Sequence, residues 1–118
     1  MQIFLCRSKT RGGRVTAKEL HYQGSITIDA DILRAANLFP GEMVYALNMH
    51  NGARVYTYII EGEAGSHAMC PNGPAARFFE IGDEIIILAI ASMTPQEATG
   101  FHMKVVELDA GNSIISCR

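Results

Sequence analysis

An almost uninterrupted apolar run at residues 84–91, EIIILAIA, constrains the fold more than any other feature of the sequence. A run of this length and composition is typical of a strand that is buried on both faces of a sheet. Strand-like segments also dominate the rest of the chain. They lie at 2–6, 14–20, 25–28, 43–49, 54–60, 103–109 and 113–117.

Turn signals separate these segments. Asn51-Gly52 predicts a hairpin between 43–49 and 54–60, because a type I′ turn needs positive φ at both central positions. A second hairpin is expected to turn at 110–112. Short helices are expected at 29–38 with Asp29 as N-cap, at 94–98 with a capping box, and at 74–79. Many short strands with Gly-rich turns and few helices predict an all-β fold, a closed barrel.

Length and composition limit the class of protein. A chain of 118 residues is one domain, and 48% hydrophobic with 19% charged residues excludes a disordered chain. A formal net charge of −2 argues against nucleic-acid and acidic-membrane partners. Three widely spaced cysteines fit reduced thiols in a cytoplasmic protein better than disulfides or a zinc site. The start of the chain lacks the charge order of a signal peptide, and no run is long enough to span a membrane.

Four local features are candidate sites, and each also has a purely structural interpretation. The basic stretch 7–14 can close on an anion or be a solvated loop, and the four histidines lack metal-ligand spacing. In the segment 54–60, Arg54, Tyr56 and Tyr58 share one face. This pattern suits an anion pocket with a proton donor, and it equally suits aromatic packing between neighbouring strands. The segment 71–77 is a turn in which glycine can admit a ligand. The pair at 24–25 joins a polar turn to a strand.

Taken together, these segments resemble one known family. After Lys9 come VTAKELHYQGSITID, NGARVYTYII, NGPAAR, IGDEIIILAIASM and TPQEA, in order and at the expected spacing. This series resembles the pyruvoyl-dependent aspartate 1-decarboxylases over about residues 9–98. The pairing of LHYQGSITID with NGARVYTY is far more specific than any single motif.

The resemblance implies that the chain is a precursor that cuts its own backbone between Gly24 and Ser25, giving chains 1–24 and 25–118. The Ser25 hydroxyl would attack the Gly24 carbonyl, and the residue at Thr57 would donate a hydrogen bond to the resulting oxyanion. Residue 25 would then become a covalent pyruvoyl group, the only cofactor implied, with no metal. In some relatives a maturation factor assists this cleavage, and both spontaneous and assisted cleavage stay open here.

The resemblance also implies the reaction. L-aspartate would form a Schiff base with the pyruvoyl group, lose CO₂, take a proton from Tyr58 and leave as β-alanine for pantothenate and coenzyme A synthesis. Lys9 and Arg54 match anchors for the substrate carboxylates. Tyr22, Asn72, Gly73, Pro74 and Ala75 match positions that line the site. The implied fold is a six-stranded double-psi β-barrel with a few short helices, assembled as a homotetramer whose active sites lie between subunits.

Two departures from the family pattern lie near the substrate. Arg11-Gly12 stands where His-Arg is usual, which predicts a more flexible Lys9 loop, and Pro74 stands where Ala is usual. Two alternatives therefore stay open. One is a pyruvoyl enzyme for another acidic amino acid, such as glutamate. The other is a non-catalytic barrel that binds DNA or protein through residues 7–14.

Overall fold

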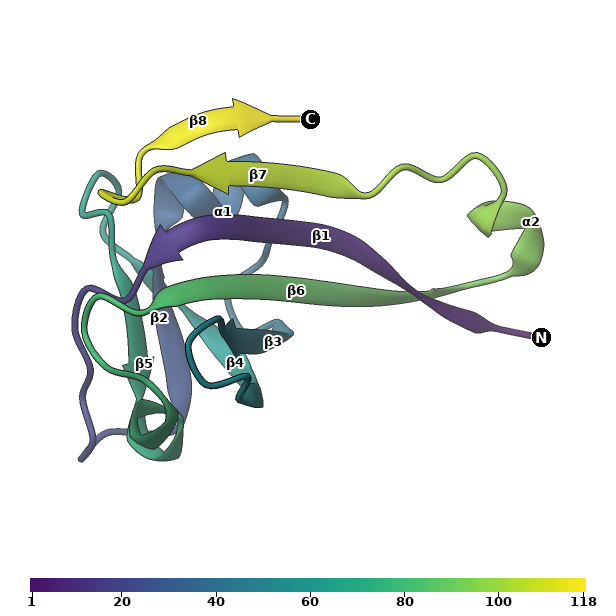
Figure 1. Ribbon diagram of the computed structural model, residues 1–118. Helices are drawn as coiled ribbons and strands as arrows, with labels where there is room; N and C mark the ends of the chain where they lie inside the picture. The colour runs from purple at the N-terminus through teal and green to yellow at the C-terminus, as the bar shows by residue number, and fades with distance from the viewer.

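Strand β6 (Glu84–Met93) lies in the middle of the fold and organises the sheet around it (Figure 1). In the computed structural model, which describes residues 1–118, β6 pairs in antiparallel fashion with β1 (Ile3–Arg14) and β3 (Met43–Asn48). The complete strand order is β5-β2-β4-β3-β6-β1-β7-β8, with parallel pairs β1/β7 and β2/β4. The other strands are β2 (Ser25–Asp29), β4 (Arg54–Gly62), β5 (Met69–Asn72), β7 (Lys104–Leu108) and β8 (Ile114–Cys117).

The predicted all-β class with a few short helices is confirmed, but the sheet contains eight strands rather than six. The two strands at the ends of the order, β5 and β8, are only four residues long each. The strand expected at 14–20 is wrong. β1 instead continues through the basic stretch to Arg14, and the amides of Val15 and Thr16 then bond to Asp83 and Met69, outside any ladder.

The expectation that the apolar run is buried on both faces is also wrong. Ile85, Ile87 and Ala89 are at most 1% exposed, whereas Ile86 and Leu88 are half-buried and Ile90 is 39% exposed. This alternation arises because the inner face of β6 lines the core, while no helix covers its outer face. The outer face of β6 is therefore an apolar surface of the single chain.

Both hairpins are confirmed, although the first uses a different turn. Residues 43–47 pair with 54–58, but only Gly52 in the connection has positive φ, at 73°. A type I′ turn needs two such residues, so the connection is a longer loop closed by the bond from Asn48 N to Ala53 O. The second hairpin joins β7 to β8, and Asn112 adopts φ 64° in its turn.

Three short helices complete the fold. Helix α1 (Ala30–Ala36) begins after the predicted N-cap Asp29 and buries Ile32, Leu33 and Ala36. Helix α2 (Pro95–Ala98) has the expected capping box between Thr94 and Glu97. The 3₁₀ helix η1 (Gly73–Phe78) occupies the third expected position.

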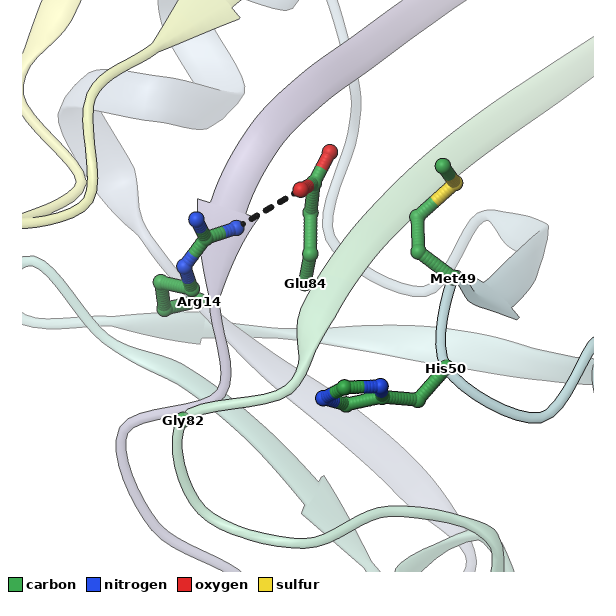
Figure 2. Close-up of a pocket in the computed structure, with 5 residues that line it drawn as sticks. All are labelled: Arg14, Met49, His50, Gly82 and Glu84. Atoms are coloured by element: carbon green, nitrogen blue, oxygen red, sulfur yellow. Dashed lines mark ion pairs between the residues drawn. The ribbon is translucent and has the colours of Figure 1, made fainter.

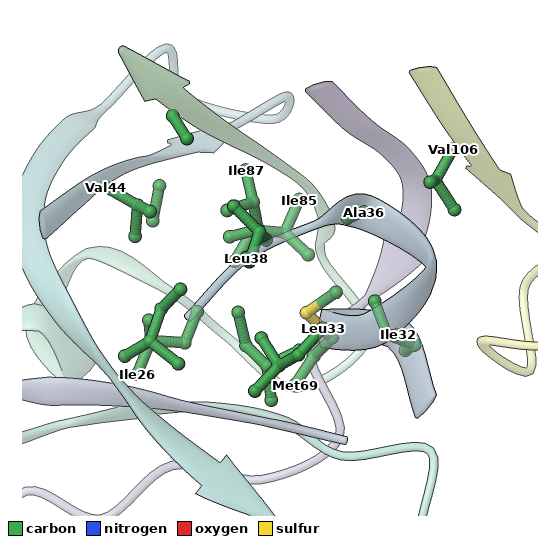
Figure 3. Packing of buried hydrophobic residues seen from close by; sticks show 14 of the residues in the cluster. Ile26, Ile32, Leu33, Ala36, Leu38, Val44, Met69, Ile85, Ile87 and Val106 are labelled. Carbon is green, nitrogen blue, oxygen red and sulfur yellow. The ribbon is translucent and has the colours of Figure 1, made fainter. Parts of the chain in front are cut away.

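A single core of 17 buried apolar residues lies between α1 and the inner faces of the strands (Figure 3). Figure 3 shows Ile26 of β2, Val44 of β3 and Ile87 of β6 converging on Leu33 and Leu38 from the helical segment. The core thus connects β2, which carries the residue of interest at position 25, to the rest of the sheet.

Asp29 ties the end of β2 to a distant loop. Its carboxylate accepts hydrogen bonds from the backbone amides of Asp31 (2.7 Å), Gly65 (3.2 Å) and His67 (2.7 Å), and the residue is only 2% exposed. Burial by itself would raise the pKa of Asp29, but these three amides together with the charge of His67 lower it below the ordinary value of 3.8.

We expect Asp29→Ala to lower the free energy of unfolding by about 2–4 kcal/mol, because it removes an N-cap and leaves buried amides without an acceptor. The pKa of Asp29 is lower in the folded chain, so its stabilisation is complete above pH ~4 and is lost as the pH falls through the folded pKa. Urea unfolding at several pH values should therefore show that the difference in the free energy of unfolding between wild type and Asp29→Ala becomes smaller in acid.

Asp31→Ala is the matched control. The Asp31 side chain is exposed and pairs only with Arg34, so its removal should change the free energy of unfolding by less than ~0.5 kcal/mol. Equal losses for the two variants would contradict the role assigned to Asp29.

Candidate functional site

Ser25 is the first residue of β2 and is fully buried, with 0% of its surface exposed. β2 lies between β4, to which it is parallel, and β5, to which it is antiparallel. The Ser25 hydroxyl donates to the carbonyl oxygen of Gln23 over 3.0 Å. A hydroxyl that is fixed one residue after an unhindered glycine carbonyl is suitably placed for intramolecular acyl transfer.

Asn72 lies directly opposite Ser25 in the β2/β5 register and is 2% exposed. Its Nδ2 donates to Ser25 Oγ (3.0 Å) and to Thr27 Oγ1 (3.0 Å). Its Oδ1 accepts from the Cys70 thiol over 3.3 Å. The side-chain amide therefore joins four side chains of two neighbouring strands.

The backbone at Gly73 approaches residues 22–24 very closely. Gly73 has φ +61°, and a Cβ there would lie 2.6 Å from Tyr22 O and 2.9 Å from Gly24 N. Its amide donates to Glu19 O over 2.7 Å. A Cβ at Gly24 would in turn lie 3.3 Å from Pro74 Cδ. The two glycines therefore lie in a region of tight backbone contact, and Ala75 is buried two residues further on in η1.

Strand β4 brings Thr57 and Tyr58 to the same place. The parallel β2/β4 register begins at Ile26, which pairs with Ile59, so Thr57 and Tyr58 directly precede the first paired residue of β4. Thr57 is 7% exposed. The Tyr58 hydroxyl donates to Gln23 Oε1 over 2.9 Å.

Lys9 and Arg54 are not brought to Ser25 within one chain. Lys9 lies on β1, and strands β4, β3 and β6 lie between β1 and β2 in the sheet. Arg54 begins β4, and its guanidinium lies 5.7 Å from the centre of the Tyr45 ring. Both residues belong to the half-exposed outer face, where Lys9 is in register with Leu88, Leu88 with Tyr45, and Tyr45 with Tyr56.

The basic stretch is a strand and not the expected loop. It forms the second half of β1, where Gly12 occupies an irregularity with φ +87° and a Cβ would overlap the carbonyl oxygen of Leu108. Three of its cations are ion-paired, and Lys9 is the one that has no ion-pair partner. The pairs are Arg7–Glu42, Arg11–Glu107 (4.0 Å) and Arg14–Glu84 (2.9 Å).

The surface pockets lie away from Ser25. One, of about 270 Å³, is lined by Arg14, Met49, His50, Gly82 and Glu84 (Figure 2). Its opposite charges neutralise each other, because Arg14 pairs with Glu84 within the pocket. Another, of about 380 Å³, lies on the outer face and is lined only by Phe4, Tyr45, Tyr56 and Ile90.

The residues that sequence reasoning missed are polar neighbours of the predicted ones. They are Glu19, Gln23, Thr27 and Cys70, which hydrogen-bond to Gly73, Tyr58 or Asn72. Proximity to residue 25 was a signal for Gln23. The others needed the β2/β5 register. No group of three or more His, Cys, Asp and Glu is placed to hold a metal ion, and none of the helices is long and apolar enough to cross a membrane.

Comparison with known proteins places this arrangement in a family. The sequence model described as aspartate decarboxylase matches residues 1–115. The chain belongs to this family. It is 47% identical to the aspartate 1-decarboxylase of Salinibacter ruber, covering 100% of this chain and 81% of that protein. It is 46% identical to the aspartate 1-decarboxylase of Thermoanaerobacter pseudethanolicus, covering 98% and 99%, and 47% identical to that of Bacteroides thetaiotaomicron, again covering 98% and 99%.

The contact at Gly73 leads to a test of the site's geometry. Gly73→Ala should cost about 1–2 kcal/mol for its left-handed backbone and a further ~1–3 kcal/mol for displacing residues 22–24. Urea unfolding measures the sum of these two costs. Every chain compared also carries Ser25→Ala, so that backbone cleavage does not affect the measurement.

Gly100→Ala is the matched control, since Gly100 has φ +82° but nothing within 4 Å of a Cβ. It should show only the backbone cost. Equal destabilisation by the two substitutions would contradict a tight contact between Gly73 and residues 22–24.

Proposed function

We propose that the protein is an aspartate 1-decarboxylase, which converts L-aspartate to β-alanine and CO₂ for pantothenate and coenzyme A synthesis. The observation that carries this proposal is the buried Gly24-Ser25 junction, held against Asn72 and Gly73 in a chain of the aspartate decarboxylase family. Relatives with this name match nearly the whole chain.

The first step of the proposal is self-cleavage. Ser25 Oγ attacks the Gly24 carbonyl carbon, and the C–N bond breaks to leave an ester and a free amine at residue 25. Loss of the Ser25 α-hydrogen then expels the Gly24 carboxylate, and water replaces the nitrogen of residue 25, which leaves as ammonia. Thr57, which is buried on β4 two residues before the partner of Ile26, is the donor for the oxyanion formed during the attack.

The surroundings of residue 25 fit the resulting pyruvoyl group. The position is fully buried, and Asn72 Nδ2, which lies 3.0 Å from Ser25 Oγ before cleavage, would be a hydrogen-bond donor beside the carbonyl group formed there. This group supplies an electron sink for the decarboxylation of an amino acid. The Tyr58 hydroxyl bonds to Gln23, two residues before residue 25, and a phenol is ordinarily protonated at neutral pH, which suits a proton donor.

Recognition of a dicarboxylic substrate requires cations. Lys9 is the unpaired cation of its segment, and Arg54 projects from β4 on the same face as Tyr58. Arg54 can hold a carboxylate through two parallel hydrogen bonds. The residues that line the remainder of the site are Tyr22, Asn72, Gly73, Pro74 and Ala75.

A homotetramer with active sites between subunits accounts for the separation of Lys9 from Ser25. The outer face exposes large apolar side chains on four neighbouring strands: Phe4 (79%), Met43 (44%), Tyr56 (58%) and Ile90 (39%). A second copy packed on this face would bury that apolar surface and could bring its Lys9 near Tyr58 in the middle of β4.

The alternative of a nucleic-acid-binding barrel is less favoured, because three cations of the basic stretch are occupied by glutamates. The alternative of another acidic substrate rests on Pro74, whose ring packs against Gly24 and which has no amide hydrogen to offer.

Intact mass under denaturing conditions tests the cleavage. The wild-type chain should separate into fragments 1–24 and 25–118, with the second blocked to N-terminal sequencing, whereas Ser25→Ala should stay whole because it lacks the attacking hydroxyl. A mature wild-type sample that stays one chain would refute the mechanism.

Substrate turnover tests the reaction itself. The cleaved wild type should release CO₂ from aspartate, and Tyr58→Phe should reduce this rate by about 10²–10⁴-fold, because the proton donor is lost. Cleavage of Tyr58→Phe, followed by mass, provides the control for correct folding and maturation. Faster turnover of glutamate than of aspartate would instead favour the alternative substrate.

A further inference from the structure

We propose that Cys70 is a positioning residue that orients the side-chain amide of Asn72 toward Ser25 and thereby sets the rate of backbone cleavage. The inference rests on the proposed self-cleavage at Gly24-Ser25. It adds a residue that does not itself take part in the attack on the Gly24 carbonyl.

The β2/β5 register brings four side chains into one cluster. Asn72 lies opposite Ser25, and Cys70 lies opposite Thr27. Residues two apart on a strand point to the same face of the sheet. The side chains of these two cross-strand pairs therefore lie together on one face of the β2/β5 pair. Pro71, between Cys70 and Asn72, points to the other face.

The thiol supplies the one hydrogen bond that Asn72 Oδ1 receives. Cys70 Sγ lies 3.3 Å from Oδ1, while Nδ2 uses its two hydrogens on Ser25 Oγ and Thr27 Oγ1, each at 3.0 Å. Asn72 is 2% exposed, so its amide has little contact with water in the folded chain. In this orientation every polar group of the amide is satisfied.

The reverse orientation of the amide would be worse for cleavage. It would turn Oδ1 toward the two hydroxyls and Nδ2 toward sulfur, a weak acceptor. Ser25 would then donate its proton to Oδ1 instead of to Gln23 O. Ser25 would also lose the Asn72 N–H donor, which stabilises negative charge on Ser25 Oγ as the hydroxyl attacks.

The Cys70 thiol must be protonated to donate a hydrogen bond, and its surroundings favour the protonated form. Burial, together with the negative charge of Glu19, raises the pKa of Cys70 above its ordinary value, which keeps the sulfur protonated at neutral pH. A serine hydroxyl at this position would donate to the same oxygen, whereas alanine or valine would not.

The test follows the cleavage of freshly made precursor by denaturing intact mass at neutral pH. Cys70→Ala and Cys70→Val should slow cleavage about 3–10-fold, the value of one hydrogen bond of about 0.5–1.5 kcal/mol. Cys70→Ser should restore a rate close to that of wild type. A role in packing alone would instead leave Cys70→Val, which fills the space of the thiol, close to wild type.

Cys6→Ala is the matched control, because Cys6 is also half-buried and its thiol bonds only to the carbonyl oxygen of Ser8. It should cleave at the wild-type rate. Urea unfolding of each variant, combined with Ser25→Ala to prevent cleavage, checks that the precursor folds. If Cys70→Ala does not fold, Cys70→Val is used in its place.

The outcomes separate the two proposals. Wild-type-like cleavage of both Cys70→Ala and Cys70→Val, or failure of Cys70→Ser to restore the rate, overturns the role of Cys70 and leaves self-cleavage standing. Absence of cleavage in the wild type overturns self-cleavage and the role of Cys70 together.

Discussion

The close approach of the Gly73 backbone to residues 22–24 is the constraint on which the site depends. A Cβ at Gly73 would lie within 3.0 Å of three backbone atoms of this segment, so only glycine lets β5 and η1 reach it. The same contact brings Asn72 opposite Ser25 and fixes the register of the β2/β5 pair. Burial of Ser25 and its hydrogen bond to Asn72 both follow from this register.

The chain separates its chemistry into two regions. At one end of β2, Ser25 and Asn72 are buried and hydrogen-bonded to each other, Thr57 is buried, and the half-buried Tyr58 bonds to Gln23. Lys9 and Arg54 lie instead on the half-exposed outer face, among aromatic and aliphatic side chains. We therefore expect the proposed backbone cut to need only one chain, and the proposed site for a dicarboxylic substrate to need a second copy that covers the outer face.

The sequence predicted local structure well where side chains report directly on the backbone. Asp29, Thr94 and the alternation of 54–60 identified two helix starts and a strand, because capping and burial are encoded by neighbouring residues. The basic stretch was misjudged, since only the fold reveals that Leu108 presses against Gly12 and that glutamates of β6 and β7 pair with its arginines.

The candidate site was predicted through family resemblance, not through local pattern. Gly24-Ser25 and the segment around Gly73 are ordinary turn sequences when taken alone, and their meaning depends on strand pairing across 47 residues between Ser25 and Asn72. Cys70 and Thr27 were invisible for the same reason: a half-buried thiol and a strand threonine are common, and only the β2/β5 register places them around one amide.

The hydrogen bond from Tyr58 to Gln23 imposes an order on the proposed chemistry. In the uncleaved chain the phenol is engaged by a residue of the segment 1–24, two positions before the bond to be cut. Ser25 is at the same time fully buried and lines no pocket, so an amino acid cannot reach it. Cleavage gives Gln23 and Gly24 the freedom of a chain end, which can release the phenol and open a path to residue 25. The precursor thus keeps its future proton donor occupied until the group that it serves has been made.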